Sequence, residues 1–140
     1  MDCTLTSFAD DDPRMRFAVS EAKASLAQFF QCFAKPGPGQ EHFLVKVQFE
    51  RVDQVEHIWV ADLDASVFPL RGTLANEPDL PGLTFMERVE FHPSQIPDWM
   101  YVENGYLVGG FTIQVIRDSL SVEERAAHDA SAPYKFKDAL

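Results

Sequence analysis

The chain has 140 residues, of which 46% are hydrophobic and 24% charged, so its size suits one domain and its composition is that of a globular protein. A formal net charge of −10 argues against a nucleic acid partner, because a phosphate backbone would be repelled, and it suits a basic protein partner or simple solubility. The sequence has no run of about 18 apolar residues and no basic leader, so we expect no membrane partner and a cytoplasmic location.

The first predicted element is a long helix that begins at Asp12 and extends to Phe33. The Asp12 side chain can accept hydrogen bonds from the first free backbone amides. Pro13 at the first helical position loses no hydrogen bond, because the backbone amide of that position has no partner within the helix. Steps of three and four residues place six apolar side chains on one stripe, which should face a sheet: Met15, Ala18, Ala22, Leu26, Phe29 and Phe33. Pro36 and Gly37 follow and predict the end of the helix.

Alternating apolar and polar residues then predict four strands, over residues 43–50, 57–62, 68–74 and 84–91. The first two are expected to form a hairpin. In the fourth strand Glu87 shares its parity with apolar residues, so either a bulge shifts the register or a carboxylate is buried.

Asn104 and Gly105 are the preferred pair for a two-residue hairpin turn, because both central positions need positive φ. This turn predicts that Glu103 pairs with Tyr106 and fixes the register of both strands, the second of which should continue through Val115. One face should then pack under the helix, and it carries Met100, Val102, Leu107, Phe111, Ile113 and Val115. The opposite face carries Trp99, Tyr101, Tyr106, Val108 and Gly110.

Ser121 and Glu124 have the spacing of a capping box, which predicts a short C-terminal helix, and Pro133 should bound it. We expect an α+β fold, with a long N-terminal helix on a curved antiparallel sheet of about five or six strands that can curl into a half-barrel. Residues 1–11 would be a flexible N-terminus, residues 12–118 a single domain, and residues 119–140 a helix and tail that pack on the domain or extend from it.

Motifs of known chemistry are absent from the sequence. It has no glycine-rich phosphate loop, no zinc-protease motif and no nucleophile elbow. The four histidines lie far apart and lack a second ligand at metal-binding spacing. We therefore expect no catalytic residue, no metal and no cofactor.

A binding surface is the remaining candidate. If the hairpin register holds, four aromatic side chains can lie together on the face opposite the helix: Trp59, Trp99, Tyr101 and Tyr106. The alternative is structural packing, in which Trp99 covers Gly110 or this face forms a minor second core. Five polar residues are lesser candidates for a site: Arg71, Asn76, Glu77, Glu87 and Asp98.

The chain resembles the bacterial domain-of-unknown-function family 2314. The resemblance covers most of residues 12–118, and it is carried by the N-terminal helix, the segment His57 to Val60, the segments around Arg71 and Asn76, and above all residues 96–101 followed by residues 105–113. It implies bacterial origin and a compact domain, and no catalytic residues.

These observations lead to three hypotheses. The first is a non-enzymatic protein-binding domain, in its most concrete form an immunity protein that neutralises a toxin by occluding a basic surface. The second is a small-molecule-binding protein or an unrecognised enzyme, with a site in the half-barrel built from Glu87, His57, Arg71 and Asp98. The third is a structural or assembly module.

Overall fold

The computed structural model describes residues 12–51 and 53–137. Two helices come first, α1 (Pro13–Ala24) and α2 (Leu26–Ala34). Six strands follow, with one 3₁₀ turn, η2 (Pro93–Gln95), between the fourth and the fifth: β1 (Gln40–Arg51), β2 (Gln54–Asp64), β3 (Leu70–Leu74), β4 (Arg88–Phe91), β5 (Asp98–Glu103) and β6 (Tyr106–Gly109). Helices α3 (Phe111–Asp118) and α4 (Val122–Ser131) complete the fold. The segment 1–11, predicted to be flexible, lies outside the described residues.

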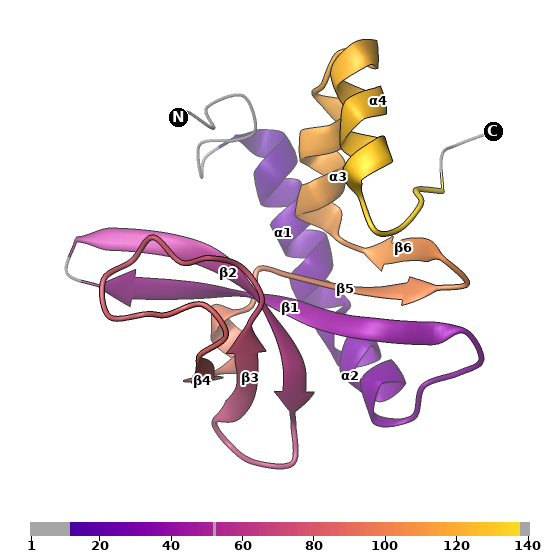
Figure 1. The fold of residues 1–140 in the computed structure, drawn as a ribbon. Coiled ribbons are helices and arrows are strands. Elements are labelled where there is room, and N and C mark those ends of the chain that lie inside the picture. Colours follow the sequence, from indigo (N-terminus) through magenta and orange to yellow (C-terminus); the bar gives the residue numbers. More distant parts are fainter. Residues whose placement is uncertain (1–11, 52, 138–140) are drawn as a thin grey trace.

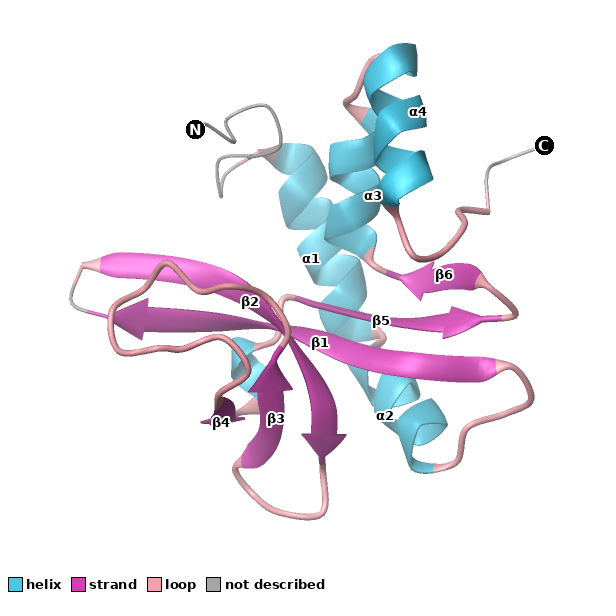
Figure 2. Cartoon of the chain, viewed as in Figure 1, coloured by secondary structure: helices cyan, strands magenta, loops and turns pink. Residues whose placement is uncertain are grey.

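The strands form one antiparallel sheet in the order β4-β3-β2-β1-β5-β6. Helices α1 and α2 lie behind it in Figure 1, while α3 and α4 stand at its β6 end. Figure 2 shows the same separation of helices and strands by colour. The predicted α+β class is confirmed, but the sheet stays open, with β4 and β6 at its edges, and does not form the half-barrel.

The predicted N-terminal helix begins as expected and is interrupted in the middle. Asp12 accepts hydrogen bonds from the amides of Arg14 and Met15, and Pro13 occupies the first turn. At Ser25 the backbone leaves helical geometry, and the Ser25 hydroxyl donates to the Glu21 carbonyl at 2.8 Å. Such back-bonding by serine bends helices, so two helices replace the single predicted one.

The β1–β2 hairpin is confirmed. The apolar side chains at the odd-numbered positions of β1 face the helices. Val45 and Val47 are fully buried there, beside Ile58 and Val60 of β2. Strand β1 also pairs with β5, with a register shift between Glu41 and Leu44. Over this half both edges of β1 are paired, so β1 is an interior strand of the sheet.

The fourth predicted strand is shorter than expected because residues 84–87 form a turn. The amide of Glu87 donates to the Thr84 carbonyl at 2.9 Å, and Met86 has a φ of +72°. The Glu87 carboxylate in turn accepts a hydrogen bond from the Thr84 amide at 2.8 Å. Neither a bulge within a strand nor a fully buried carboxylate explains Glu87: its side chain closes the turn.

The β5–β6 hairpin has the predicted register, since Glu103 pairs with Tyr106 and Met100 with Gly109. The predicted strand through Val115 is wrong, however, because Gly109 and Gly110 both adopt positive φ. Helix α3 starts directly after them. The chain therefore turns away from the sheet where the sequence pattern suggested that the strand continues.

The face of this hairpin that packs under α1 and α2 is also the opposite of the predicted one. Trp99 and Tyr101 lie in the main core with Phe29. The opposite face carries a second apolar cluster, covered by α3 and the C-terminal segment. It contains Met100, Val102 and Leu107, with Leu44, Trp59, Ile113, Tyr134 and Phe136 packed against it.

The C-terminal helix is confirmed with its cap, since Ser121 and Glu124 make the reciprocal bonds of a capping box. Beyond it, the Leu107 amide donates to the Lys135 carbonyl at 2.8 Å, which adds one bridge to the outer edge of β6. Arg117 donates to both carboxylate oxygens of Asp129 and lies 4.3 Å from the centre of the Phe136 ring. These contacts attach the C-terminal segment to the edge of β6 and to α3.

Candidate functional site

The proposed aromatic surface is not present in its predicted form, because two of its four rings are core residues. Trp99 is 5% and Tyr101 8% exposed. The indole Nε1 of Trp99 donates to the Ala22 carbonyl at 3.1 Å, and burial raises the pKa of Tyr101 to about 12. The prediction that these rings face solvent is wrong, and the alternative of structural packing is right for both.

The other two aromatic residues remain accessible but lie apart. Tyr106 is half-buried on the outermost strand, with the Lys137 ammonium 6.0 Å from its ring centre. Trp59 is half-buried on β2, on the sheet face that carries the second apolar cluster. Trp59 lines a pocket on this face.

The polar candidates lie apart from one another, and four of the five have structural partners. Arg71 forms an exposed pair with Glu90 at 3.2 Å across β3 and β4. The Asn76 side chain accepts a hydrogen bond from the Trp59 amide at 2.8 Å. Glu77 is exposed, Glu87 closes the turn described above, and Asp98 is buried. The structure therefore does not bring these residues together into a common site.

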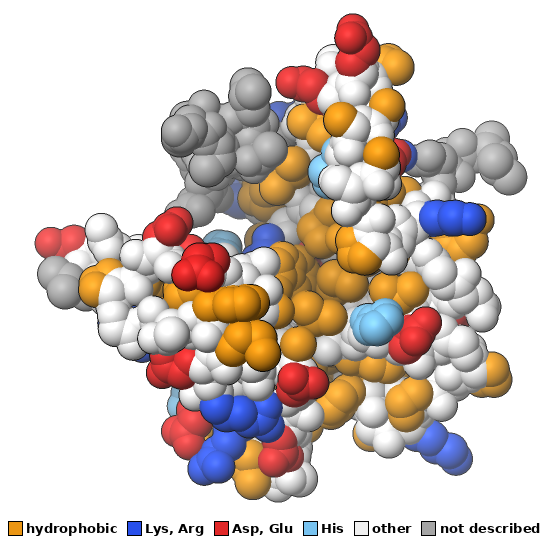
Figure 3. All heavy atoms as spheres, in the orientation of Figure 1, with side chains coloured by type: hydrophobic (Ala, Val, Ile, Leu, Met, Phe, Trp, Pro, Cys, Tyr) orange, Lys and Arg blue, Asp and Glu red, His pale blue; other side chains and the backbone are white. Residues whose placement is uncertain are grey.

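A pocket of about 360 Å³ lies on the sheet face opposite α1 and α2. We call it the Trp59 pocket. Strands β1, β2 and β5 form its floor, while α3 and the segment after α4 form its wall. Its lining residues are His42, Leu44, Trp59, Ala75, Asn76, Met100, Val102, Ile113, Pro133 and Tyr134. Figure 3 shows hydrophobic side chains gathered on this face between α4 and the strands.

A hydrogen-bonded network of Asp98, Thr112 and Lys46 holds the wall of this pocket in place. Asp98 is fully buried, and its carboxylate accepts hydrogen bonds from the amides of Phe111 and Thr112 at 3.1 and 2.9 Å. It therefore caps the N-terminus of α3 from a neighbouring strand, where the helix dipole favours a negative charge. The Thr112 hydroxyl also donates to Asp98 and accepts a bond from the Lys46 ammonium at 2.6 Å.

Burial shifts the pKa values of the two charged groups in this network, Asp98 and Lys46. It raises the pKa of Asp98, and the hydrogen bonds from Thr112 and the charge of Lys46 act in the opposite direction. Desolvation lowers the pKa of Lys46, and the Asp98 charge opposes this change. The Lys46 ammonium also lies 5.2 Å from the centre of the Trp59 ring. Such a contact fixes the indole at the edge of the pocket.

The Trp59 pocket offers a mostly apolar surface to a ligand. Its walls are mostly hydrocarbon and aromatic, and its polar atoms come from His42, Asn76 and Tyr134. Thr112 is only 2% exposed, so its hydroxyl cannot reach a ligand. Sequence reasoning named Trp59 and Asn76 but missed Tyr134 and His42, because the pocket joins segments that are distant in the chain.

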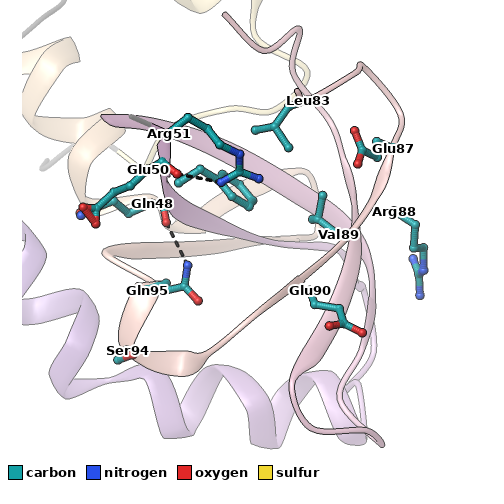
Figure 4. A pocket seen from close by; sticks show the side chains of 11 residues that line it. Gln48, Glu50, Arg51, Leu83, Glu87, Arg88, Val89, Glu90, Ser94 and Gln95 are labelled. Atoms are coloured by element: carbon teal, nitrogen blue, oxygen red, sulfur yellow. Dashed lines mark hydrogen bonds between the residues drawn. The ribbon is translucent and has the colours of Figure 1, made fainter. Parts of the chain in front are cut away.

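A second, more polar cleft of about 590 Å³ lies between the far end of β1 and strand β4. Figure 4 shows Gln48, Glu50 and Arg51 on one side and Val89 and Glu90 on the other. The Gln95 side chain reaches across its floor and donates to the Gln48 carbonyl at 3.1 Å.

Within residues 12–51 and 53–137, no group of three or more potential metal ligands comes together. No helix in that part of the chain is both long and apolar enough to cross a membrane.

Comparisons with known proteins identify relatives but no activity. A family model described as "Uncharacterized protein conserved in bacteria (DUF2314)" matches residues 12–136. A putative ankyrin repeat protein of Neisseria meningitidis is 39% identical over 100 residues, which is 68% of this chain. The chain covers 40% of that relative's length.

The protein YegJ of Escherichia coli K12, described as uncharacterized, is 25% identical over 122 residues. The match covers 86% of this chain and 78% of YegJ. No solved structure matches the chain.

Proposed function

The chain belongs to the DUF2314 family of bacterial proteins, and we propose that it is a non-catalytic binding module that recognises another protein through the Trp59 pocket. The observation that carries this proposal is the pocket itself, an apolar concavity with an accessible indole on the face that α1 and α2 leave open. Protein interfaces are anchored by one or a few large side chains inserted into such pockets.

The size of the pocket suits one large side chain of a partner. A volume of about 360 Å³ is near the lower end of the range of roughly 300–1,000 Å³ that ligand pockets span. The apolar floor of Leu44, Met100 and Val102 favours an aromatic or aliphatic group, which removes that floor from water. Trp59 and Tyr134 can contact the same group from the sides.

Charge favours a partner with basic residues next to this anchor. The chain carries a net charge of −10. Glu41 shares the face of its pairing partner Val102 and lies 3.7 Å from His42, and the exposed Glu77 follows Asn76. Acidic groups at the rim steer a basic partner and add to specificity. Occlusion of a basic surface on a toxin is the most concrete form of this function.

The Neisseria relative supports a binding role. Its name describes a putative ankyrin repeat protein, and this chain matches only 40% of its length. Ankyrin repeats build extended surfaces that bind other proteins. A segment similar to this chain therefore occurs within a protein that is named for a binding architecture.

The experiment is a selection of phage-displayed random linear peptides on the full chain, followed by affinity measurements with purified peptides. We expect peptides with an aromatic or aliphatic anchor and neighbouring Lys or Arg. Trp59→Ala should weaken their binding by about 2 kcal/mol, as for an interface anchor. The control Phe17→Ala removes a ring that is 68% exposed on α1 and should leave binding unchanged.

Equal affinity of the selected peptides for wild type and Trp59→Ala would contradict the proposal. Stabilisation of the fold by a metabolite, lost in Trp59→Ala, would instead assign the pocket to a small molecule.

A further inference from the structure

The second half of β1 has a free edge toward the β1–β4 cleft. Strand β5 pairs with β1 only as far as Lys46 and Asp98, so beyond this point β1 pairs with β2 alone. The Gln48 carbonyl accepts a bond from the Gln95 side chain and therefore points away from β2. Because main-chain direction alternates along a strand, Glu50 also directs its amide and carbonyl toward this side.

Strand β4 presents a second free edge, since it is the last strand of the sheet. The Leu74 amide donates to the Glu87 carbonyl at 2.9 Å, which fixes the phase of the β3–β4 ladder. In this phase Val89 faces β3 with its main-chain groups. The amides and carbonyls of Arg88 and Glu90 face away from β3.

Four of the five charged side chains that line the cleft have partners within the chain, and Glu50 on β1 is the fifth. Arg88 donates to the Asp62 carbonyl at 2.6 Å, and Arg51 to the Glu50 carbonyl at 2.8 Å. Glu87 is bonded to the Thr84 amide, and Glu90 pairs with Arg71. The groups of β4 that have no such partner are main-chain groups, which select another main chain rather than a charged small molecule.

The other edge of the sheet shows how this fold accepts an added segment. There the Leu107 amide donates to the Lys135 carbonyl, and the Lys135 amide donates to the Gly105 carbonyl, each at 2.8 Å. Residues after α4 thus cover the edge of β6, in an extended conformation. No described segment of the chain covers the edge of β4 in this way.

We propose that the β1–β4 cleft binds an extended segment of a partner polypeptide, which adds to the free edge of β4 as a new strand. The segment lies in the cleft of about 590 Å³, with β1 as the opposite wall. Main-chain bonds to Arg88 and Glu90 supply the affinity, and alternate side chains of the segment contact Leu83. This site is separate from the Trp59 pocket and does not depend on it.

The test separates main-chain from side-chain recognition at a single position. Phage-displayed random linear peptides are selected on full-length Trp59→Ala protein, which removes binding at the other pocket. Glu90→Pro deletes the outward amide, a change that an edge strand tolerates because this amide does not bond to β3. Glu90→Ala is the matched control, because it removes the carboxylate and keeps the amide. Both variants lose the exposed pair with Arg71.

We expect Glu90→Pro to weaken peptide binding by at least about tenfold, since one main-chain hydrogen bond and its neighbouring contacts are lost. Glu90→Ala should change it less than about threefold. Equal losses in both variants, no loss in either, or the absence of selected peptides would each overturn the proposal.

Amide hydrogen exchange keeps the test valid if Glu90→Pro does not fold. In Trp59→Ala protein the amides of Arg88 and Glu90 should exchange rapidly, and a selected peptide should slow their exchange by at least about tenfold. Slow exchange before peptide is added, or no change after it, would show that this edge does not accept a strand.

Discussion

Removal of the Asp98 carboxylate should destabilise the fold more than any surface substitution. This group accepts bonds from the amides of Trp99, Phe111 and Thr112 at 2.8, 3.1 and 2.9 Å, and a fourth from the Thr112 hydroxyl. Asp98→Ala leaves these donors without an acceptor. Leaving one buried donor without its hydrogen bond costs about 1–3 kcal/mol, and because several donors are affected together we expect a loss of about 3–5 kcal/mol.

The assay is urea unfolding followed by circular dichroism, with the free energies extrapolated to water. A loss of about 3–5 kcal/mol is a large part of the roughly 5–15 kcal/mol that stabilises a domain. Asp118→Ala is the control, because it removes an exposed carboxylate at the opposite end of α3. A loss below about 1 kcal/mol in Asp98→Ala, the value of an ordinary exposed pair, would refute the assignment of Asp98 as the cap of α3.

Three further predictions concern packing and pH. Gly109→Ala should cost at least about 2 kcal/mol in urea unfolding, because φ is +77° and a Cβ would lie 2.5 Å from the Trp99 ring; an unchanged midpoint would contradict this. Trp99→Ala should cost about 3–5 kcal/mol and Trp59→Ala clearly less, since Trp59 is only half-buried; the reverse order in thermal unfolding would contradict the assignment of faces. Hydrogen bonds from Arg117 lower the pKa of Asp129 to about 2, from 3.8. The stabilisation from this pair is therefore complete above pH 3.8 and is lost as the pH falls toward 2. The difference in unfolding free energy between wild type and Asp129→Asn should therefore shrink over this interval, and a difference independent of pH would contradict the pairing.

Local signals in the sequence predicted the elements that depend on local chemistry. The Asp12 cap, the Ser121 capping box and the Asn104–Gly105 turn are all present as expected. Each of them depends on a hydrogen bond or a φ angle within a few residues, so an isolated sequence contains the information.

Such local signals do not predict the side of the sheet on which α1 and α2 pack. Alternation separates Trp99 and Tyr101 from Met100 and Val102, but both pairs are apolar. Both faces of this hairpin are covered, one by α1 and α2 and the other by α3 and the C-terminal segment. The pattern of residues cannot choose between two buried faces.

The helix α3 and the Trp59 pocket were missed for a related reason. Residues 111–115 alternate as a strand would, and this alternation predicts that the strand continues past Gly110. In the structure the positive φ angles of Gly109 and Gly110 end the strand, and Asp98, twelve residues before Gly110, supplies the helix cap. Tertiary capping of this kind fixes the start of α3, whose Ile113 lines the pocket with Trp59, and no short motif predicts it.

The most direct test of the proposed function uses the fluorescence of the two tryptophans separately. Trp99→Phe leaves Trp59 as the only indole, and Trp59→Phe leaves Trp99. On titration with a peptide selected on the wild-type chain, the emission of Trp59 should shift to shorter wavelength and become shielded from acrylamide, while the Trp99 signal stays constant. An unchanged Trp59 signal at saturating peptide, or a change confined to Trp99, would contradict binding at the Trp59 pocket.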